Sequence, residues 1–183
     1  MPNSRTVALV IGSLRQDSVS RKIANAFAGL QPDLQFKAIG IGDLPMFNQD
    51  REARPPAEWV RFREEIAACD AILFVTPEYN RSVPGVLKNA LDVGSRPYGQ
   101  SVWNGKPGAV ISVSPGAIGG FGANHHLRQS LVFLNVPLLS QEVYIGNAFS
   151  LFDDGGALIN DGTRDLLRAQ GKALAAWIER ILA

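Results

Sequence analysis

Short apolar runs without a polar interruption alternate along this chain with longer segments in which apolar residues recur at helical spacing. The clearest runs are residues 7–11 and 71–75, and residues 108–113 form a further strand segment that contains one serine. A run of this length is typical of a strand that is buried on both faces, as in sheets that helices cover on both sides. Weaker runs at residues 36–41 and 137–145 bring the number of expected strands to five.

Segments with helical spacing lie between and after these strands. They are expected at residues 18–30, 56–68, 86–93, 124–134 and 163–182. The last helix should turn one apolar face inward, formed by Leu166, Leu167, Leu174, Trp177, Ile178 and Ile181. Residues 42–56 contain several glycines and prolines, and we expect them to form an irregular surface loop.

Regular alternation of strand and helix predicts parallel strands, right-handed crossovers and helices on both faces of one sheet. A six-stranded dinucleotide fold consists of two similar halves, whereas only five strands are expected here. A flavodoxin-like strand order is therefore favoured. We therefore expect residues 1–183 to form a single domain of the α/β class, a three-layer α/β/α sandwich with a five-stranded parallel sheet in the order 2-1-3-4-5. Ligands of such sheets bind beyond the carboxyl ends of the strands, so the segments after strands one, three and four are the candidate site.

Charge and composition exclude several classes of protein. Lysine and arginine number 18 against 17 aspartates and glutamates, and the formal net charge of +1 argues against a general nucleic-acid binder. The single cysteine, Cys69, excludes an internal disulfide framework and a cysteine-cluster metal site. No apolar run approaches the roughly 20 residues of a membrane span, and the first eleven residues lack the apolar stretch of a secretory signal. We expect a cytoplasmic protein that binds neither nucleic acid nor membranes.

The segment between the first strand and the first helix, residues 12–20, concentrates groups that bind anions. It contains Ser13, Arg15, Ser18 and Ser20. The free N–H groups and the positive dipole end of a helix start stabilise a phosphate, and an arginine adds a charge with forked geometry. A lone serine here would be an ordinary N-cap, but the cluster favours an anion site. Neither the Walker pattern nor Gly-x-Gly-x-x-Gly occurs, which argues against ATP hydrolysis and a Rossmann NAD site.

Two further loops would face the same ligand. Residues 76–85 carry Tyr79 as a stacking face and Asn80 as an amide donor, a combination that suits a flat heterocycle. A helix start at Pro84 and a simple turn at Asn80 explain this loop equally well. Residues 114–122 contain glycines that would let the backbone approach a planar ligand, although alone they would suggest a flexible turn. Together with the first loop, these segments would form three walls of one pocket.

Other chemically active residues have simpler explanations. His125 and His126 are adjacent, so on a helix they point about 100° apart, which favours a surface or interface role over metal binding. Cys69 is expected to be a small packing residue. The acidic turn at residues 153–156 lacks the spacing of an EF-hand. Glu78 has no partner carboxylate nearby in the sequence, so we assign it no acid or base role. No metal site and no covalent hydrolase triad is expected.

Two motifs occur together in this chain and make a specific pair. They are Gly12-Ser13-Leu14-Arg15 with Ser18, and Pro-Glu-Tyr-Asn-Arg-Ser-Val-Pro-Gly at residues 77–85 followed by Leu-Lys-Asn-Ala at 87–90. The pair resembles the NADPH-dependent FMN reductase family, in particular its bacterial quinone and chromate reductase branch. The resemblance extends over nearly the whole chain. It implies a flavodoxin-like enzyme that binds FMN non-covalently and oxidises NADH or NADPH to reduce quinones, free flavins, azo dyes or metal oxyanions such as chromate.

The resemblance also implies the cofactor-binding residues by position. They are Ser13, Leu14, Arg15, Ser18, Val19, Ser20, Pro77, Glu78, Tyr79, Asn80, Arg81, Ser114 and Gly116. The first loop would surround the FMN phosphate, the second would hold the flavin ring and ribityl chain, and the third would approach the pyrimidine end. The chain departs from the family at residues 92–97, Asp-Val-Gly-Ser-Arg-Pro, where relatives often have Asp-Trp-Ala-Ser-Arg-Pro.

The implied mechanism needs no protein acid or base, because the cofactor carries the redox chemistry. A nicotinamide would stack on the flavin, pass a hydride to N5 and leave before the acceptor enters, which gives ping-pong kinetics. Backbone N–H groups near the O2/N1 edge would stabilise the anionic reduced ring. As a hypothesis, Arg15, Arg81 and Arg96 make the pocket mouth positive and attract NADPH phosphates or chromate.

Several alternatives stay open at the level of sequence. The chain could supply free reduced FMN, act as an azoreductase, carry electrons like a flavodoxin, or be a non-catalytic nucleotide-binding regulator. Its neutral charge argues against a flavodoxin, since those carriers are usually acidic. No 2′-phosphate site can be recognised, so the coenzyme preference is open. Relatives form dimers and tetramers, and we expect a homo-oligomer, a homotetramer in the first instance, with apolar surface near residues 98–103 and 126–134.

Overall fold

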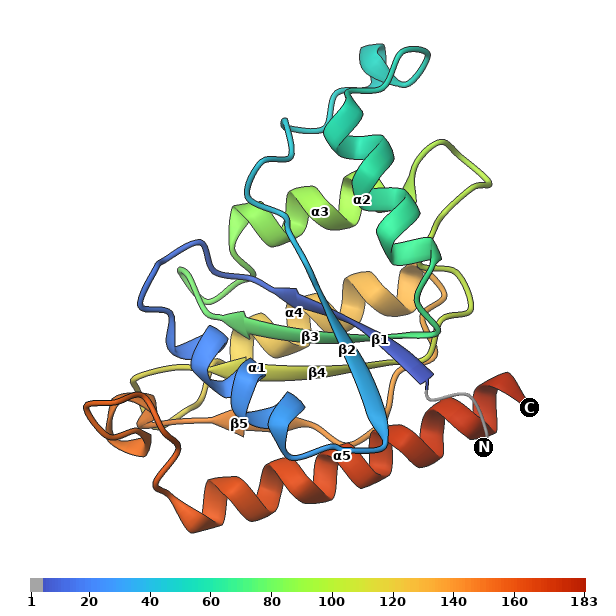
Figure 1. The fold of residues 1–183 in the computed structure, drawn as a ribbon. Helices are drawn as coiled ribbons and strands as arrows, with labels where there is room; N and C mark the ends of the chain where they lie inside the picture. Colours follow the sequence, from blue (N-terminus) through green and yellow to red (C-terminus); the bar gives the residue numbers. More distant parts are fainter. Residues whose placement is uncertain (1–4) are drawn as a thin grey trace.

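Strands and helices alternate throughout the part of the chain that the computed structural model describes, residues 5–183 (Figure 1). The strands are β1 (Arg5–Ile11), β2 (Leu34–Ile39), β3 (Ala71–Pro77), β4 (Gly108–Val113) and β5 (Val143–Ile145). The helices are α1 (Val19–Gly29), α2 (Ala57–Ala67), α3 (Gly85–Ser95), α4 (Phe121–Phe133) and α5 (Asp161–Leu182). Two short 3-10 turns, η1 (Gln49–Arg51) and η2 (Ala148–Leu151), lie in the connections.

All neighbouring strands run parallel in the order β2-β1-β3-β4-β5. This confirms the predicted strand order and the flavodoxin-like arrangement. Leu9 of β1 pairs with Leu73 of β3, which pairs in turn with Ala109 of β4. Because parallel strands end at one edge of a sheet, the loops after β1, β3, β4 and β5 meet there, on the left of Figure 1.

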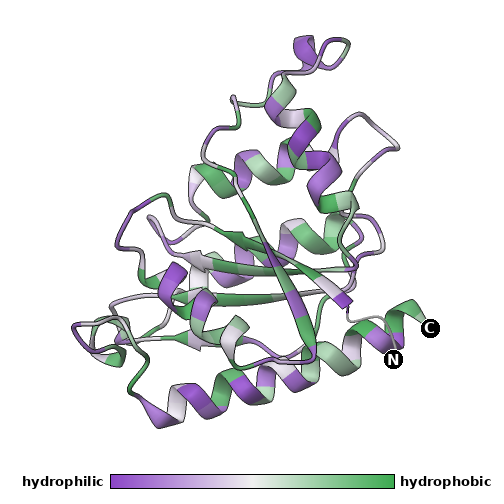
Figure 2. Cartoon of the chain, viewed as in Figure 1, coloured by the Kyte–Doolittle hydropathy of each residue, from purple (hydrophilic) through white to green (hydrophobic). Residues whose placement is uncertain are grey.

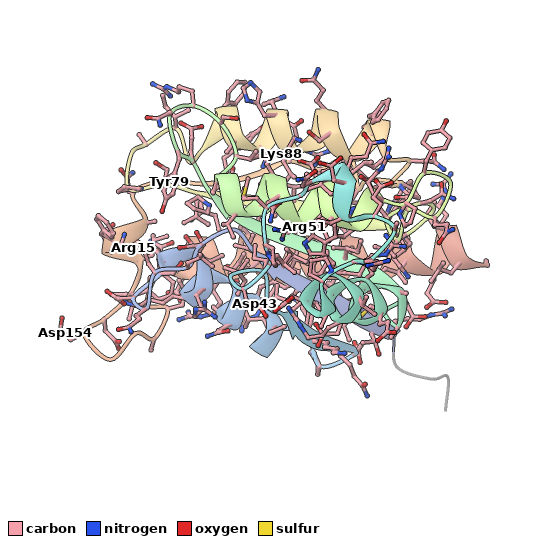
Figure 3. The ribbon with its side chains drawn as sticks, turned by 90° about the horizontal axis from the view of Figure 1, so that it is seen from above. Arg15, Asp43, Arg51, Tyr79, Lys88 and Asp154 are labelled. Carbon is pink, nitrogen blue, oxygen red and sulfur yellow. The ribbon has the colours of Figure 1, made fainter. Side chains whose placement is uncertain are left out.

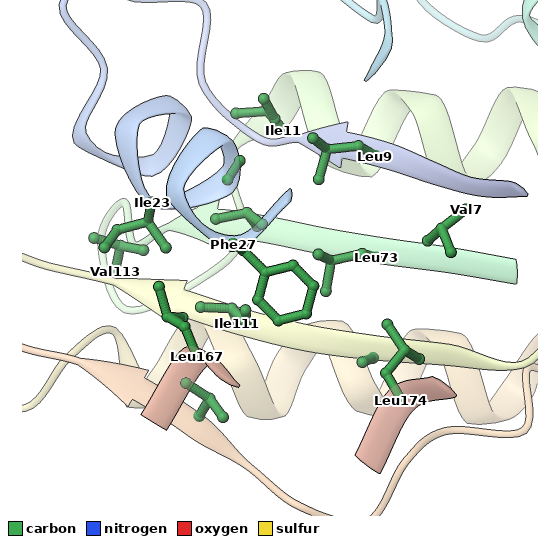
Figure 4. Close-up of a cluster of buried hydrophobic side chains, with 14 of the residues drawn as sticks. Val7, Leu9, Ile11, Ile23, Phe27, Leu73, Ile111, Val113, Leu167 and Leu174 are labelled. Carbon is green, nitrogen blue, oxygen red and sulfur yellow. The ribbon is translucent and has the colours of Figure 1, made fainter. Parts of the chain in front are cut away.

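Helices cover the sheet on both faces, α1 and α5 on one and α2, α3 and α4 on the other (Figure 1). Successive side chains of a strand point to opposite faces, so Leu9 joins the core under α1 and α5 while Val10 joins the core under the other helices. Figure 4 shows the first of these cores, in which Phe27 of α1 lies near Leu73 of β3. The strands are accordingly apolar along most of their length in Figure 2, whereas the helices carry polar residues on their outer sides.

An ion pair joins the start of β1 to the end of α5. Arg5 Nε donates a hydrogen bond to Glu179 Oε1 at 2.8 Å. This contact raises the pKa of Arg5 and lowers the pKa of Glu179, chiefly through that hydrogen bond. Since β1 begins here, the ion pair lies at the amino-terminal end of the strands, opposite the converging loops.

The fifth strand is shorter than the predicted segment, residues 137–145. It covers only Val143–Ile145. Pro137 has no N–H to donate to a strand partner, and Leu138 forms only an isolated bridge with Gly108. The prediction was therefore wrong about the length of this strand and right about its place in the sheet.

Two predictions about the last helices also need correction. Helix α4 begins at Phe121, three residues before the predicted start at Asn124, because Gly120 takes the left-handed conformation (φ 76°) immediately before it. In α5, Leu166 was expected to face inward, but it is 42% exposed, and Ile181 is only partly buried. The buried stripe of α5 is therefore narrower than expected. Among residues 5–183, no helix has the length and apolar character that crossing a bilayer requires.

Trp103 packs against the segment where the chain departs from the family pattern. Its ring is fully buried, and its Nε1 donates to Leu91 O at 3.0 Å. A Cβ atom on Gly94 would lie 2.5 Å from the indole. The absence of a side chain at Gly94 thus makes room for a tryptophan that comes from a different part of the chain.

Candidate functional site

A pocket of about 190 Å³ opens where the strands end, and we call it the strand-end pocket. Nine of the residues predicted from the sequence line it, namely Ser13, Arg15, Ser18, Val19, Ser20, Pro77, Glu78, Tyr79 and Ser114. They come from the segments after β1, β3 and β4, as the topology predicts. Figure 3 shows Arg15 and Tyr79 at the same end of the molecule.

The loop after β1 presents three largely buried serines at the start of α1. Ser13, Ser18 and Ser20 are each at most 5% exposed. Ser18 is the N-cap, as the simpler interpretation had it, and its Oγ accepts a hydrogen bond from Arg21 N at 3.3 Å. Within residues 5–183, the hydroxyls of Ser13 and Ser20 form no hydrogen bond and no acidic side chain occupies the first turn of α1. Neither hydroxyl is sealed away from the pocket, because the buried side-chain polar atom without a partner among residues 5–183 is Gln170 Nε2. Both hydroxyls are therefore free to donate to an anion that binds in the pocket.

The loop after β3 turns tightly at its tip. Tyr79 N donates to Ser82 O at 3.0 Å, and Ser82 N donates to Tyr79 O at 2.9 Å. Between them, Asn80 and Arg81 have positive φ angles of 50° and 63°. Two consecutive residues with positive φ are typical of a hairpin turn. Asn80 and Arg81 therefore form the turn and are not among the residues that line the pocket.

The same loop forms hydrogen bonds with the start of α4. Glu78 Oε2 accepts a hydrogen bond from Ala123 N at 3.1 Å, and His126 Nδ1 lies 2.9 Å from Ser82 Oγ. A Cβ atom on Gly122 would lie 2.5 Å from Arg81 O. Glu78 thus caps a helix from a neighbouring loop, which gives its side chain a positioning role at the wall of the pocket.

The loop after β4 forms the third wall, and its glycines act through conformation. Gly119 and Gly120 have positive φ angles of 64° and 76°, which bring the chain back to start α4. Ser114 lines the pocket, and its Oγ accepts from Gly116 N at 3.1 Å. Gly116 itself is not a lining residue, and its carbonyl accepts from Asn147 N at 3.3 Å.

The sequence interpretation missed part of the lining. Val113, Pro115, Ala148 and Phe149 also line the pocket. The last two belong to η2, which follows β5, and the carboxyl end of a fifth parallel strand was the signal that could have indicated them. The predicted residue Leu14 lies outside, 57% exposed and folded over Gly42.

The three arginines of the charge hypothesis are separated in the structure. Arg15 lines the strand-end pocket and is exposed. The Arg81 side chain is 73% exposed and 3.5 Å from Glu78. Arg96, by contrast, lines a different hollow and donates from Nε to Glu52 Oε1 at 2.5 Å. The hypothesis therefore fails for Arg96, because an ion pair that the sequence could not indicate neutralises it away from the pocket.

The two histidines of α4 bind other side chains. His125 Nε2 lies 3.0 Å from the hydroxyl of Tyr144, which also donates to Glu142 Oε2. Burial, followed by this hydrogen bond, raises the pKa of Tyr144 to about 12, so the phenol stays protonated at neutral pH. Within residues 5–183, no three His, Cys, Asp or Glu side chains are grouped as a metal site would need.

The pocket fits FMN in its chemistry. A phosphate suits the groups at this end of the pocket, which are serine hydroxyls without a protein partner, the free N–H groups of the first turn of α1 and the Arg15 charge. Tyr79, Pro77 and Phe149 supply the flat and apolar surface that a flavin ring would contact. When bound, this cofactor supplies hydride chemistry that no side chain of the pocket offers.

Comparisons with known proteins agree with this geometry. The family model for NADPH-dependent FMN reductase matches residues 5–150. A quinone reductase of Pseudomonas putida is 62% identical over 177 residues, which is 95% of each chain. A 2-hydroxy-1,4-benzoquinone reductase of a Burkholderia species is 47% identical over 174 residues, 94% of this chain and 95% of that protein.

A solved structure extends the likeness to three dimensions. FerB, a flavoenzyme NAD(P)H:(acceptor) oxidoreductase from Paracoccus denitrificans, superposes with a TM-score of 0.91 at 40% identity and covers 96% of this chain and 98% of its own. The fold, the strand-end pocket and the family model lead to the same assignment. This chain belongs to the NADPH-dependent FMN reductase family, whose members are FMN-dependent oxidoreductases.

Proposed function

We propose that this protein is an FMN-containing reductase that transfers electrons from NADH or NADPH to quinones. The observation that carries the proposal is the strand-end pocket, where the hydroxyls of Ser13 and Ser20 face the pocket without a protein partner beside the start of α1 and Tyr79 borders the opening. Relatives that are 62% and 47% identical are named quinone reductases, which supports the acceptor class.

The chain's own residues bind and orient, and none of them acts as a catalytic acid or base. Ser13, Ser20 and Arg15 hold the phosphate, while Tyr79 is half exposed at the mouth. One opening serves both substrates, so the oxidised coenzyme leaves before the quinone enters. We therefore propose ping-pong kinetics, with parallel double-reciprocal lines when NADPH and a soluble quinone are varied together.

A spectrum of the purified protein tests the proposal. We expect flavin absorption bands that bleach when NADPH is added without oxygen and return when a quinone is added. The double variant Ser13→Ala/Ser20→Ala should bind FMN at least about tenfold more weakly, since two charge-assisted hydrogen bonds are lost. A wild-type protein that stays colourless after incubation with FMN would refute the proposal.

Chromate is a proposed second acceptor. The exposed side chains of Arg15 and Arg81 near the mouth provide positive charge that would attract a small dianion. We expect Arg81→Ala, which removes none of the groups proposed to hold the FMN phosphate, to lower kcat/KM for chromate and to weaken its dependence on salt. The rate with an uncharged quinone should change much less.

The rival functions differ in whether the flavin stays bound and what accepts its electrons. FMN that remains with the protein through gel filtration would exclude a reductase that releases reduced flavin. Steady NADPH oxidation with a quinone and no second protein would exclude a flavodoxin-type carrier. An azo dye assayed beside the quinone distinguishes the azoreductase alternative.

We also propose a cytoplasmic homotetramer. Two separate apolar surfaces support a dimer of dimers, which needs two kinds of contact. One is a hollow of about 300 Å³ between α2 and α3, with Tyr98 next to it at 89% exposure. The other is the end of α4, where Phe133 is 88% exposed. In sedimentation experiments, Tyr98→Ser and Phe133→Ser should each reduce the tetramer to a smaller species, and an unchanged mass would contradict the proposal.

A further inference from the structure

Phe149 is an aromatic residue of the strand-end pocket that lies outside both sequence motifs. It belongs to η2, the 3-10 turn after β5, and lines the pocket together with Ala148. Phe149 is 65% exposed. Within residues 5–183, its ring lies against no other aromatic ring and belongs to neither of the two apolar cores. A large apolar side chain that stands in water at the wall of a pocket is available to a bound ligand.

The backbone on both sides of Phe149 is fixed. Ala148 before it is fully buried, and Leu151 after it is 6% exposed in the core beneath α1 and α5. Ala148 N donates a hydrogen bond to Ser114 O at 3.2 Å, which joins η2 to the loop after β4. The position of Phe149 is therefore set before a ligand arrives, and little conformational entropy is lost when the ring makes a contact.

The connection that carries η2 also reaches the start of α1. A Cβ atom on Gly156, in the same connection, would lie 3.9 Å from Lys22 Cε. Lys22 in turn pairs with Asp17 of the loop after β1 at 2.6 Å. Figure 1 shows this connection, in orange, at the end of the sheet where the loops after β1 and β4 also lie. The segment between β5 and α5 thus extends from the third wall of the strand-end pocket to the first.

The chemistry of Phe149 suits the uncharged part of FMN. Ser13, Ser20 and Arg15 offer hydroxyl groups and charge to the phosphate, whereas a phenyl ring offers a flat apolar surface. We infer that Phe149 packs against the flavin and retains FMN in the pocket between turnovers, so that FMN is a resident cofactor and does not exchange with free flavin. The inference rests on the proposed function, in which FMN occupies the strand-end pocket.

Retention by Phe149 predicts an effect on the release of FMN. A contact from a wall that is already in place acts once the complex has formed, and such contacts change dissociation more than association. We expect Phe149→Ala to raise the dissociation rate constant of FMN about tenfold, the effect of losing one aromatic contact. The association rate constant should stay nearly the same. Phe149→Tyr keeps the ring and should restore slow release.

Rapid mixing with detection of flavin fluorescence measures both rates without catalysis. Dilution of the FMN-loaded protein gives the dissociation rate, and mixing of apoprotein with FMN gives the association rate. The matched control is Ile159→Ala, which removes another exposed apolar side chain of the same connection, outside the lining of the pocket. Equal dissociation rates for Phe149→Ala and the wild type would overturn the inference. An effect of Ile159→Ala as large as that of Phe149→Ala would do the same.

Riboflavin distinguishes the contact of Phe149 from those of the phosphate site, because it has the ring and the ribityl chain of FMN but no phosphate. Phe149→Ala should weaken the binding of both flavins by the same factor, so the ratio of their dissociation constants stays that of the wild type. The double variant Ser13→Ala/Ser20→Ala should weaken FMN alone and bring the two constants closer together. A ratio altered by Phe149→Ala would show that the residue acts through the phosphate and would refute the inference.

The outcomes separate this inference from the proposed function. If the wild-type protein retains FMN and reduces quinones while Phe149→Ala releases FMN no faster, the inference fails and the proposed function stands. If NADPH does not reduce the bound flavin but Phe149→Ala still accelerates its release, the proposed function fails and the role of Phe149 stands.

Discussion

Gly122 illustrates how closely two walls of the strand-end pocket approach each other. A Cβ atom at this position would lie 2.5 Å from Arg81 O and 3.0 Å from Glu78 Oε2. Backbone atoms cannot yield as the end of a flexible side chain can. Any residue larger than glycine must therefore displace the loop after β3 from the start of α4.

We expect Gly122→Ala to weaken FMN binding by about tenfold or more, since overpacking of this kind costs about 1 to 3 kcal/mol. Quenching of flavin fluorescence on titration with apoprotein would measure the Kd. Gly85→Ala is the matched control, because Gly85 also begins a helix but has nothing within 4 Å of its Cβ position. Similar dissociation constants for both variants would contradict this interpretation.

Individual site residues could be predicted where their role is local. Ser18 could be recognised as a helix start, and the serines around it lie in the pocket because they precede and begin the same helix. The positive φ of Arg81 and the pairing of Arg96 with Glu52 could not be predicted. The first is a backbone conformation within the turn between Tyr79 and Ser82, and arginine rarely adopts it. The second joins segments that are distant in the sequence, and a single sequence does not specify such contacts.

At the scale of elements, the start of α4 depends on another loop. Its N-cap is Gly120, which has no side chain to accept a hydrogen bond from the first turn. Glu78 supplies that acceptor from the loop after β3. The helix is therefore completed only when the pocket wall is in place.

Removing this acceptor should destabilise the protein. We expect Glu78→Ala to lower the free energy of unfolding by about 1 to 2 kcal/mol, the usual cost of a lost cap. Glu78→Gln keeps an acceptor oxygen and should lose less. Urea denaturation of the apoprotein measures both, with Glu64→Ala, an exposed position on α2, as the control. A loss for Glu64→Ala as large as that for Glu78→Ala would show that the cap is not the cause.

The bounds of the strands were predictable where a strand lies in the middle of the sheet and less predictable for the outermost strand. β3 and β4 are apolar apart from the buried Thr76 and Ser112, and their observed bounds include the predicted ones. The edge strand β5 pairs with one neighbour only, so its length depends on which residues find a partner, and Pro137 and Leu138 lie outside the strand.

At the scale of the whole molecule, α5 makes a close contact with the segment that follows α1. A Cβ atom on Gly171 would lie 1.9 Å from Gln31 Cδ. Gln31 is buried, and its Nε2 donates to Leu167 O at 3.1 Å, so its amide cannot move aside without losing that bond. The contact joins the last helix to the connection between α1 and β2.

Gly171→Ala should therefore lower the free energy of unfolding by about 1 to 3 kcal/mol. Adding Gln31→Ala should recover part of this loss, because the clash is removed, and the double-mutant cycle isolates the interaction. Urea denaturation at one temperature is sufficient. Gly29→Ala, with nothing within 4 Å of the new Cβ, is the control and should not destabilise the fold. Purely additive effects of the two substitutions would argue against the contact.

The order of the sheet was predictable because alternation, parallel pairing and crossover handedness leave few topologies. The edge at which the pocket lies follows from the same argument. This argument does not predict individual contacts between elements. The contacts of Gly171 with Gln31 and of Glu78 with Ala123 join segments that the periodicity does not relate.

The ion pair between Arg5 and Glu179 has a practical consequence for immobilising this protein or fusing it to another enzyme. It holds the start of β1 and the end of α5 together at the sheet edge away from the strand-end pocket. An electrode linker, a resin or a second enzyme joined beyond Glu179 would stand clear of the opening through which coenzyme and acceptor pass. Immobilised through α5, the protein should keep its turnover, whereas a linker on the loop that carries Tyr79 should obstruct it.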